Sequence, residues 1–136
     1  LANAVHPTVV QAVDTWQGSP GEISRDLAAE RDVFATFAEN IESSTAGNVA
    51  PHRMGWREFF ATWEGPIRLV HIDAAHTYEE VRDNIEAVLP FVVPDGIICG
   101  DDIQDPSIQR AVWDTIGNAN IGIGSKVWHW RKRTHG

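Results

Sequence analysis

Short apolar segments alternate with segments of helical periodicity, and this alternation most restricts what the chain can fold into. Apolar or β-branched runs predict strands at Thr8 to Val13, Val49 to Met54, Ile67 to Ile72, Ile97 to Gly100 and Ser125 to Trp130. Apolar residues with helical spacing predict helices at Ser24 to Glu42, Trp56 to Trp63, Thr77 to Leu89 and Pro106 to Ile116. Because strands joined through helices usually pair in parallel, we expect one α/β domain over residues 1–136.

Turn and capping residues predict where these elements begin and end. Thr77 and Glu80 have the spacing of a capping box, and Asp105 precedes a proline that suits the first helical position. Residues 94–96 are expected to turn the chain into the strand that begins at Ile97, and residues 122–124 are expected to form a turn before the last strand.

The composition excludes several classes of protein. The formal net charge of -8 argues against a nucleic-acid-binding surface, which needs a basic footprint. No apolar run approaches the roughly 20 residues that a membrane span requires, and the first residues lack the pattern of a signal peptide. Cys99 is the single cysteine, so no internal disulfide is expected and the cytoplasm is the predicted location.

Aspartates follow three of the predicted strands: Asp14, Asp73, and the pair Asp101 and Asp102. Each alone suits a turn or a helix cap. Ligands of open α/β sheets bind beyond the carboxyl ends of the strands, where these carboxylates would gather. Asp73, Asp101 and Asp102 provide the oxygen ligands that a hard divalent cation prefers, which favours Mg²⁺, Mn²⁺ or Ca²⁺ over zinc.

The three segments that carry these aspartates also resemble a known family. Residues Val13–Gly18, Ile72–Val81 and Pro94–Asp102 are similar to the ends of the second, fourth and fifth strands of class I S-adenosylmethionine-dependent methyltransferases. The resemblance is greatest to methyltransferase domain family 24 and extends to metal-dependent O-methyltransferases of catechols, caffeoyl esters and macrolide sugars. It spans roughly Val9 to Trp130 and implies a Rossmann-like fold, with a mostly parallel sheet and flanking helices.

The resemblance implies a cofactor site for S-adenosylmethionine. Asp14 matches the acid that holds the ribose, and the residues after the third strand match those that line the adenine. The residues assigned to the cofactor are Asp14, Thr15, Trp16, Gly55, Trp56 and Asp73.

The resemblance also implies a metal-assisted transfer of a methyl group to a hydroxyl oxygen of a small molecule. Asp73, Asp101 and Asp102 match the metal ligands, with Mg²⁺ as the expected ion. His76 stands where catechol-type enzymes carry a lysine, so His76 is the expected proton acceptor, with Asp73 as the second catalytic residue. The expected partner is a small hydroxylated acceptor, with no nucleic acid and no membrane.

The family's first strand and glycine-rich loop should precede Asp14 by roughly twenty residues, by the usual spacing of such units. Leu1 to Pro7 look instead like the end of the first helix. We therefore expect an N-terminally truncated domain. It would lack the central strand of the sheet, whose place is between the strands that end at Asp14 and Asp73. Such a fragment is expected to show little activity alone, and its unpaired strand edges would favour self-association into a homo-oligomer.

The sequence is also compatible with two other functions. His71, Asp73 and His76 spell His-x-Asp-x-x-His, which is typical of a metallohydrolase, although the apolar surroundings of His71 favour a core histidine. A non-catalytic α/β module that binds a partner is the other alternative. Trp16, Trp56 and Trp63 suit either a cofactor pocket or core packing.

Overall fold

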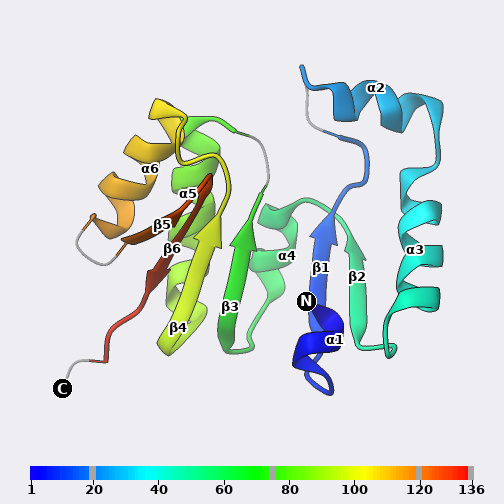
Figure 1. Cartoon of the computed structure of the whole chain (residues 1–136), viewed down its shortest axis with the longest axis horizontal. Helices are drawn as coiled ribbons and strands as arrows, with labels where there is room; N and C mark the ends of the chain where they lie inside the picture. The colour runs from blue at the N-terminus through cyan, green and yellow to red at the C-terminus, as the bar shows by residue number, and fades with distance from the viewer. Residues whose placement is uncertain (19–20, 74–75, 119–120, 135–136) are drawn as a thin grey trace. The chain divides into compact units, whose positions relative to one another are not determined.

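The computed structural model describes residues 1–18, 21–73, 76–118 and 121–134 (Figure 1). The chain divides into two compact units, Leu1–Ala61 and Thr62–Gly136. The described strands form a two-stranded sheet in the first unit and a four-stranded sheet in the second. Helices flank parallel strands in both, so the predicted α/β class is confirmed.

The first unit is built on one parallel pair of strands. Its elements are α1 (Ala2–Val5), β1 (Val10–Asp14), α2 (Ile23–Glu30), α3 (Val33–Ser44), β2 (Val49–Arg53) and most of α4 (Trp56–Thr62). Strands β1 and β2 pair in register from Val10 opposite Val49 to Asp14 opposite Arg53. The carboxyl ends of both strands therefore lie at the same edge.

The prediction of a single helix from Ser24 to Glu42 is wrong in one respect, because two helices occupy this range. The chain leaves helical geometry at Arg31, the C-cap of α2, and Asp32 caps α3 by accepting a hydrogen bond from the Ala35 N–H at 3.0 Å. An aspartate favours the N-cap over the helix interior, and this preference starts a new helix within a continuous apolar pattern.

The second unit contains a four-stranded mixed sheet in the order β3-β4-β6-β5. Its elements are β3 (Ile67–Ile72), α5 (Tyr78–Val88), a 3₁₀ turn η1 (Leu89–Phe91), β4 (Val92–Gly100), α6 (Pro106–Ile116), β5 (Ile121–Gly124) and β6 (Val127–Arg131). Strands β3 and β4 are parallel, whereas β6 pairs antiparallel with both β4 and β5. The predicted parallel arrangement thus holds for β3 and β4 and ends at the β5–β6 hairpin.

Two predicted turns are strands in the structure. Residues 94–96 lie inside β4. Ile67 of β3 pairs with Val92, but Leu69 pairs with Ile97, so β4 has extra residues here and its pairing with β3 is irregular. Asp95, whose φ is +62°, is one of these extra residues. Gly122 lies in β5, and a Cβ at this position would overlap the His129 ring. A glycine therefore admits the neighbouring ring, and the chain turns later, at Ser125 with φ +59°.

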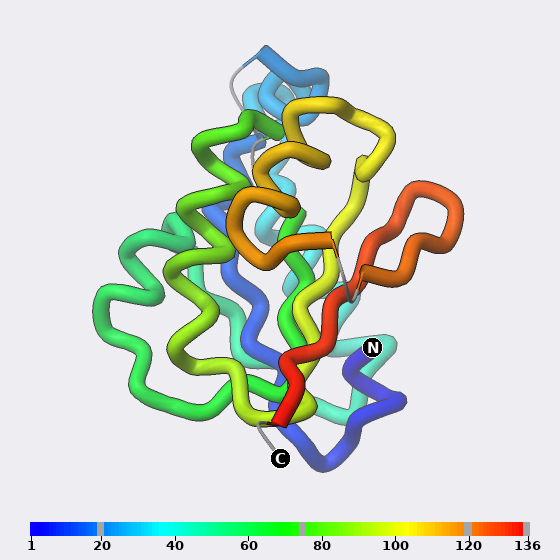
Figure 2. The backbone as a smooth tube through the Cα atoms, turned by 90° about the vertical axis from the view of Figure 1, so that its left-hand side faces the viewer, coloured from blue at the N-terminus to red at the C-terminus, as the bar shows by residue number. Residues whose placement is uncertain are grey.

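Helices α5 and α6 lie side by side and cover one face of the four-stranded sheet (Figures 1 and 2). Ile85 and Val112 from these helices are fully buried, as is Ile98 of β4, and Trp128 of β6 is 1% exposed. Such apolar burial stabilises the unit by roughly 1.5–3 kcal/mol for each large side chain. Among the described residues, no helix is long and apolar enough to cross a membrane.

Candidate functional site

The carboxyl ends of β3 and β4 bring two of the predicted aspartates together. Ile72 pairs with Gly100 in the parallel register, and Asp73 and Asp101 are the next residues of the two strands. They therefore lie at the same edge of the sheet, as expected from the sequence. Asp14 ends β1 in the first unit.

Three side chains converge at this edge of the second unit: Asp73, His76 and Asp102. The His76 Nε2 atom lies 3.2 Å from Asp73 Oδ1 and 3.3 Å from Asp102 Oδ2. One donor atom from each residue lies within 4.8 Å of the others. The side chains are 52%, 36% and 32% exposed, respectively, so the cluster is open to solutes while its members remain in contact.

Local backbone geometry explains how Asp102 enters the cluster. Its φ of +62° lies in the left-handed region, which aspartate tolerates better than most residues. The Asp102 carbonyl accepts a hydrogen bond from the Asp105 N–H at 2.9 Å, just before α6. Gln104 Nε2 donates to Asp102 Oδ1 at 3.2 Å, which leaves Oδ2 directed at His76.

The start of α5 holds the other side of the cluster. Thr77 follows His76 and caps the helix, with Oγ1 accepting the Glu80 N–H at 3.2 Å. This contact confirms Thr77 as the predicted N-cap. His76 therefore precedes a capped helix end, whereas the residues between it and Asp73 lie outside the described part of the chain.

The separations within the cluster fit a small divalent cation. Two donors about 2.1 Å from one octahedral ion, at right angles to each other, are about 3 Å apart. The contacts of His76 Nε2 with the Asp73 and Asp102 oxygens, at 3.2 and 3.3 Å, are close to this spacing. Two carboxylates and one imidazole could thus serve as ligands of a single divalent ion.

Asp101, the third predicted metal ligand, lies outside this group of donors and contacts His71 instead. Its Oδ2 atom is 3.2 Å from His71 Nε2. The expectation of a core histidine at His71 is wrong, because its side chain is 45% exposed while Ile72 is only 7% exposed. Alternation along β3 places Ile72 toward the helices and His71 on the opposite face. The metallohydrolase pattern of two histidines around Asp73 therefore does not converge here.

The predicted cofactor residues of the first unit also meet at one sheet edge. The Met54 N–H donates to the Asp14 carbonyl at 2.9 Å, so Gly55 and Trp56, the next residues, follow directly beside the end of β1. The Asp14 carboxylate is exposed and accepts the Trp16 N–H at 3.1 Å. Thr15 Oγ1 accepts the Gln17 N–H at 3.2 Å, which helps to shape the same loop.

Trp16 and Trp56 differ in what they offer to a ligand. The Trp16 indole is 9% exposed, and its ring centroid lies 4.8 Å from those of Phe34 and Phe37. The Trp16 side chain therefore packs in an aromatic cluster, which is one of the two roles expected for it. The Trp56 ring is only partly buried and has the Arg57 guanidinium 4.2 Å from its centroid.

A comparison with known families matches this chain over most of its length. Residues 1–103 match the profile of methyltransferase domain family 24, described as a methyltransferase domain. The chain belongs to this family. No curated protein sequence matches it.

Solved structures share the fold of this methyltransferase domain at low sequence identity. The O-methyltransferase NovP superposes with a TM-score of 0.68 at 19% identity, over 96% of this chain and 62% of its own. The TDP-rhamnose 3'-O-methyltransferase CalS11 gives 0.58 at 14% identity, over 90% and 57%. PaMTH1 of Podospora anserina, solved with SAH bound, gives 0.60 at 13% identity, over 91% and 72%. The chain thus spans about three fifths of the first two structures.

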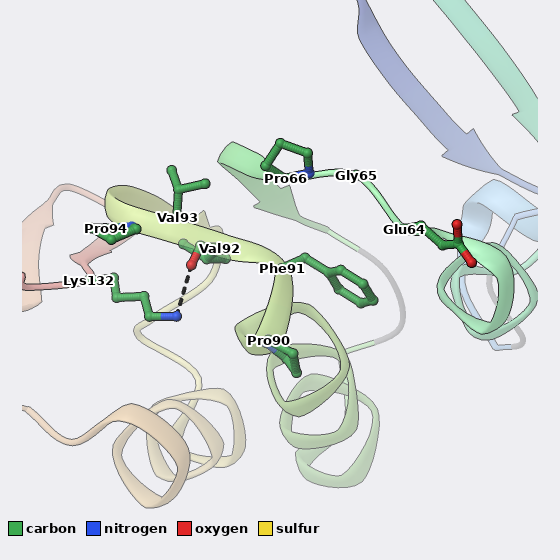
Figure 3. A pocket seen from close by; sticks show the side chains of 9 residues that line it. All are labelled: Glu64, Gly65, Pro66, Pro90, Phe91, Val92, Val93, Pro94 and Lys132. Atoms are coloured by element: carbon green, nitrogen blue, oxygen red, sulfur yellow. Dashed lines mark hydrogen bonds between the residues drawn. The ribbon is translucent and has the colours of Figure 1, made fainter.

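The methyltransferase domain also carries a cavity of about 480 Å³ at the opposite edge of the second sheet (Figure 3). Pro66, which precedes β3, and Val92, which begins β4, both line it, together with Phe91. Lys132 Nζ donates to the Val92 carbonyl at 2.8 Å and to the Leu89 carbonyl at 3.3 Å, so this ammonium mainly ties the start of β4 to the chain after β6. The cavity is separate from the cluster at the carboxyl ends.

Cys99 is a half-buried thiol beside the candidate site. Its Sγ–H donates to the Val70 carbonyl at 3.4 Å. Burial raises the pKa of the Cys99 thiol, and the negative charge of Asp101 raises it further. A thiol held in its protonated form is a poor nucleophile, which agrees with a structural role.

Proposed function

We propose that the protein is an S-adenosylmethionine-dependent methyltransferase that methylates a hydroxyl oxygen of a small molecule with the help of a divalent cation. Membership of the methyltransferase domain family supports the transfer reaction. The observation that carries the cation site is the convergence of Asp73, His76 and Asp102 within 4.8 Å. The names of two similar structures, an O-methyltransferase and a 3'-O-methyltransferase, support oxygen as the acceptor atom.

Five of the six proposed cofactor residues, all except Asp73, lie in the first unit. S-adenosylmethionine supplies an electrophilic methyl group when it is bound. The exposed Asp14 carboxylate would accept hydrogen bonds from the ribose hydroxyls, as carboxylates at strand ends commonly do. The Trp16 and Thr15 contacts hold the Asp14 loop, and the half-buried Trp56 offers an aromatic surface next to it.

In the second unit, the chain's own residues would bind the cation and orient the acceptor. A divalent cation lowers the pKa of a hydroxyl that it binds. Asp73 and Asp102 would provide two negative charges, and Gln104 holds the Asp102 carboxylate in its present orientation. Asp101 remains a proposed ligand of the same ion. It directly follows β4 beside the site, so its carboxylate could turn toward the ion.

The position of His76 supports a ligand role more than the proton-acceptor role predicted from the sequence. Its Nε2 atom is directed at both carboxylates, at 3.2 and 3.3 Å, which is where a bound ion would lie. The substitution His76→Gln separates the two roles. A ligand role predicts weaker Mn²⁺ binding, whereas a proton-acceptor role predicts normal binding and slow turnover.

The cation site is tested by calorimetric titration of Mg²⁺ and Mn²⁺ against wild-type protein and the variant Asp102→Asn. Loss of one carboxylate ligand should weaken binding at least about tenfold, which corresponds to about 1.4 kcal/mol. Asp95→Asn is the matched control, because it removes the same charge from an exposed position near the opposite end of β4, where asparagine also tolerates the positive φ. Equal affinities for wild-type and Asp102→Asn would refute the site.

The transferase reaction needs its own test. With the full-length protein, hydroxylated small molecules should be methylated only when S-adenosylmethionine is present, and S-adenosylhomocysteine should accumulate in equal amount. Metal-dependent turnover of an ester or phosphate without S-adenosylmethionine would favour a metallohydrolase instead.

A further inference from the structure

We propose that the hydrogen bond between Tyr78 and Asp114 is a positioning contact that fixes His76 relative to Asp102 in the cation site. The proposal rests on the proposed cation site and concerns residues outside the cluster itself. Tyr78 is the first residue of α5 and Asp114 lies in the second half of α6. The Tyr78 hydroxyl donates to Asp114 Oδ2 at 2.8 Å.

Two arginines hold the Tyr78 ring while Asp114 holds its hydroxyl. The Arg110 guanidinium lies 4.5 Å from the ring centroid and that of Arg82 lies 5.6 Å from it. Arg82 follows Tyr78 by one helical turn on α5, and Arg110 precedes Asp114 by one turn on α6. The hydrogen bond to Asp114 also raises the pKa of Tyr78, as expected for a phenol that donates to a carboxylate.

These contacts join the two helices that carry the two sides of the cation site. His76 is separated from Tyr78 only by the helix cap Thr77. Asp102 is joined to the start of α6 through its carbonyl, which accepts the Asp105 N–H. A displacement of α5 against α6 would therefore change the separation between His76 Nε2 and Asp102 Oδ2, now 3.3 Å. Metal ligands need accurate placement, so such a displacement should lower cation affinity.

Packing between the helices offers a competing explanation. Ile85, Val112 and Ile108 are almost completely buried where α5 and α6 meet the core. If this apolar packing alone positions the helices, loss of the Tyr78 contact should lower stability slightly and leave cation binding unchanged. Cation affinity and stability must therefore be measured on the same variants.

The test measures Mn²⁺ affinity by calorimetry, and urea unfolding, for Tyr78→Phe, Asp114→Ala and the double variant of the full chain. Tyr78→Phe removes only a hydroxyl and changes no charge near neutral pH. We expect each single variant to bind Mn²⁺ roughly five- to tenfold more weakly, a loss within the net contribution of one typical hydrogen bond. The double variant should be no weaker than the single ones, because both remove the same contact.

Two further variants separate the hydrogen bond from charge. Glu86→Ala removes one exposed carboxylate of α5 whose charge acts on Arg82 and not on the hydrogen bond of Tyr78, so it should change Mn²⁺ affinity less than about twofold, within the range of screened surface charges. Asp114→Asn keeps an acceptor for the Tyr78 hydroxyl and should retain most of the affinity. The nitrogen coupling of His76 in the electron paramagnetic resonance spectrum of bound Mn²⁺ should weaken in Tyr78→Phe and persist in Glu86→Ala.

Unchanged Mn²⁺ affinity in Tyr78→Phe, with or without a loss of stability, would overturn the positioning role but not the cation site. An equal loss of affinity in Glu86→Ala and Asp114→Ala would also overturn it, because charge would then explain the effect. Absence of Mn²⁺ binding by the wild-type protein would overturn the cation site and the positioning role together.

Discussion

Gly100 is the position where one added methyl group should disturb both the sheet and the candidate site. It ends β4, immediately before Asp101, and it is buried. A Cβ at this position would lie 2.8 Å from the Ile72 carbonyl oxygen and 2.8 Å from Trp128 Nε1. Neither neighbour can move easily, because the carbonyl belongs to the paired backbone of β3 and the indole is 1% exposed.

Gly100→Ala should therefore lower the free energy of unfolding by about 1–3 kcal/mol, the usual cost of forcing extra volume into a packed core. It should also weaken Mg²⁺ binding, because the displaced carbonyl of Ile72 is bonded directly to Asp73. Urea unfolding followed by tryptophan fluorescence and calorimetric titration measure the two effects. Gly124→Ala is the control, since a Cβ there would meet nothing within 4 Å. If both variants unfolded at the same urea concentration and bound Mg²⁺ equally, the steric argument would be refuted.

Two other predictions concern the core and the single thiol. Ile85→Ala should cost about 2–5 kcal/mol of unfolding free energy, because Ile85 is fully buried; a change below 1 kcal/mol in urea unfolding would contradict its place in the core. Cys99 should react slowly with iodoacetamide, since its raised pKa lowers the thiolate fraction at any pH below that value. Asp101→Asn should lower the pKa of Cys99 and speed alkylation only in part, because burial is the larger cause; a rate equal to that of a free thiol would contradict this order.

Local sequence patterns predicted the parts of the fold that depend on local interactions. Asp105 caps α6, with Oδ1 accepting the Ser107 N–H at 2.8 Å, and Thr77 caps α5 as its spacing indicates. The aspartates at the ends of β3 and β4 also followed from the sequence, because the end of an apolar run marks the end of a strand. The family resemblance made the metal and cofactor hypotheses specific.

Features that depend on pairing between distant segments were missed. Residues 94–96 have the composition of a turn, yet they continue β4, where Asp95 donates its N–H to the Lys132 carbonyl at 2.8 Å. Gly122 also has the composition of a turn, but it lies in β5, where the absence of a side chain leaves room for the His129 ring. His71 was expected in the core because its neighbours are apolar, although alternation along β3 could have placed it on the face opposite Ile72. The contacts of His71 with Asp101 and of Tyr78 with Asp114 join residues far apart in the sequence, so no local sequence pattern predicts them.

The strand order β3-β4-β6-β5 has a consequence for synthesis on the ribosome. Strand β6 lies between β4 and β5 but is translated after both of them. Until Val127–Arg131 has left the exit tunnel, β4 lacks its antiparallel neighbour and β5 has no partner in this sheet. The nascent second unit would therefore expose an unpaired strand edge next to the buried Ile98, and such edges favour aggregation or chaperone binding. This sheet should consequently be completed only after β6, with Trp128, has emerged from the ribosome.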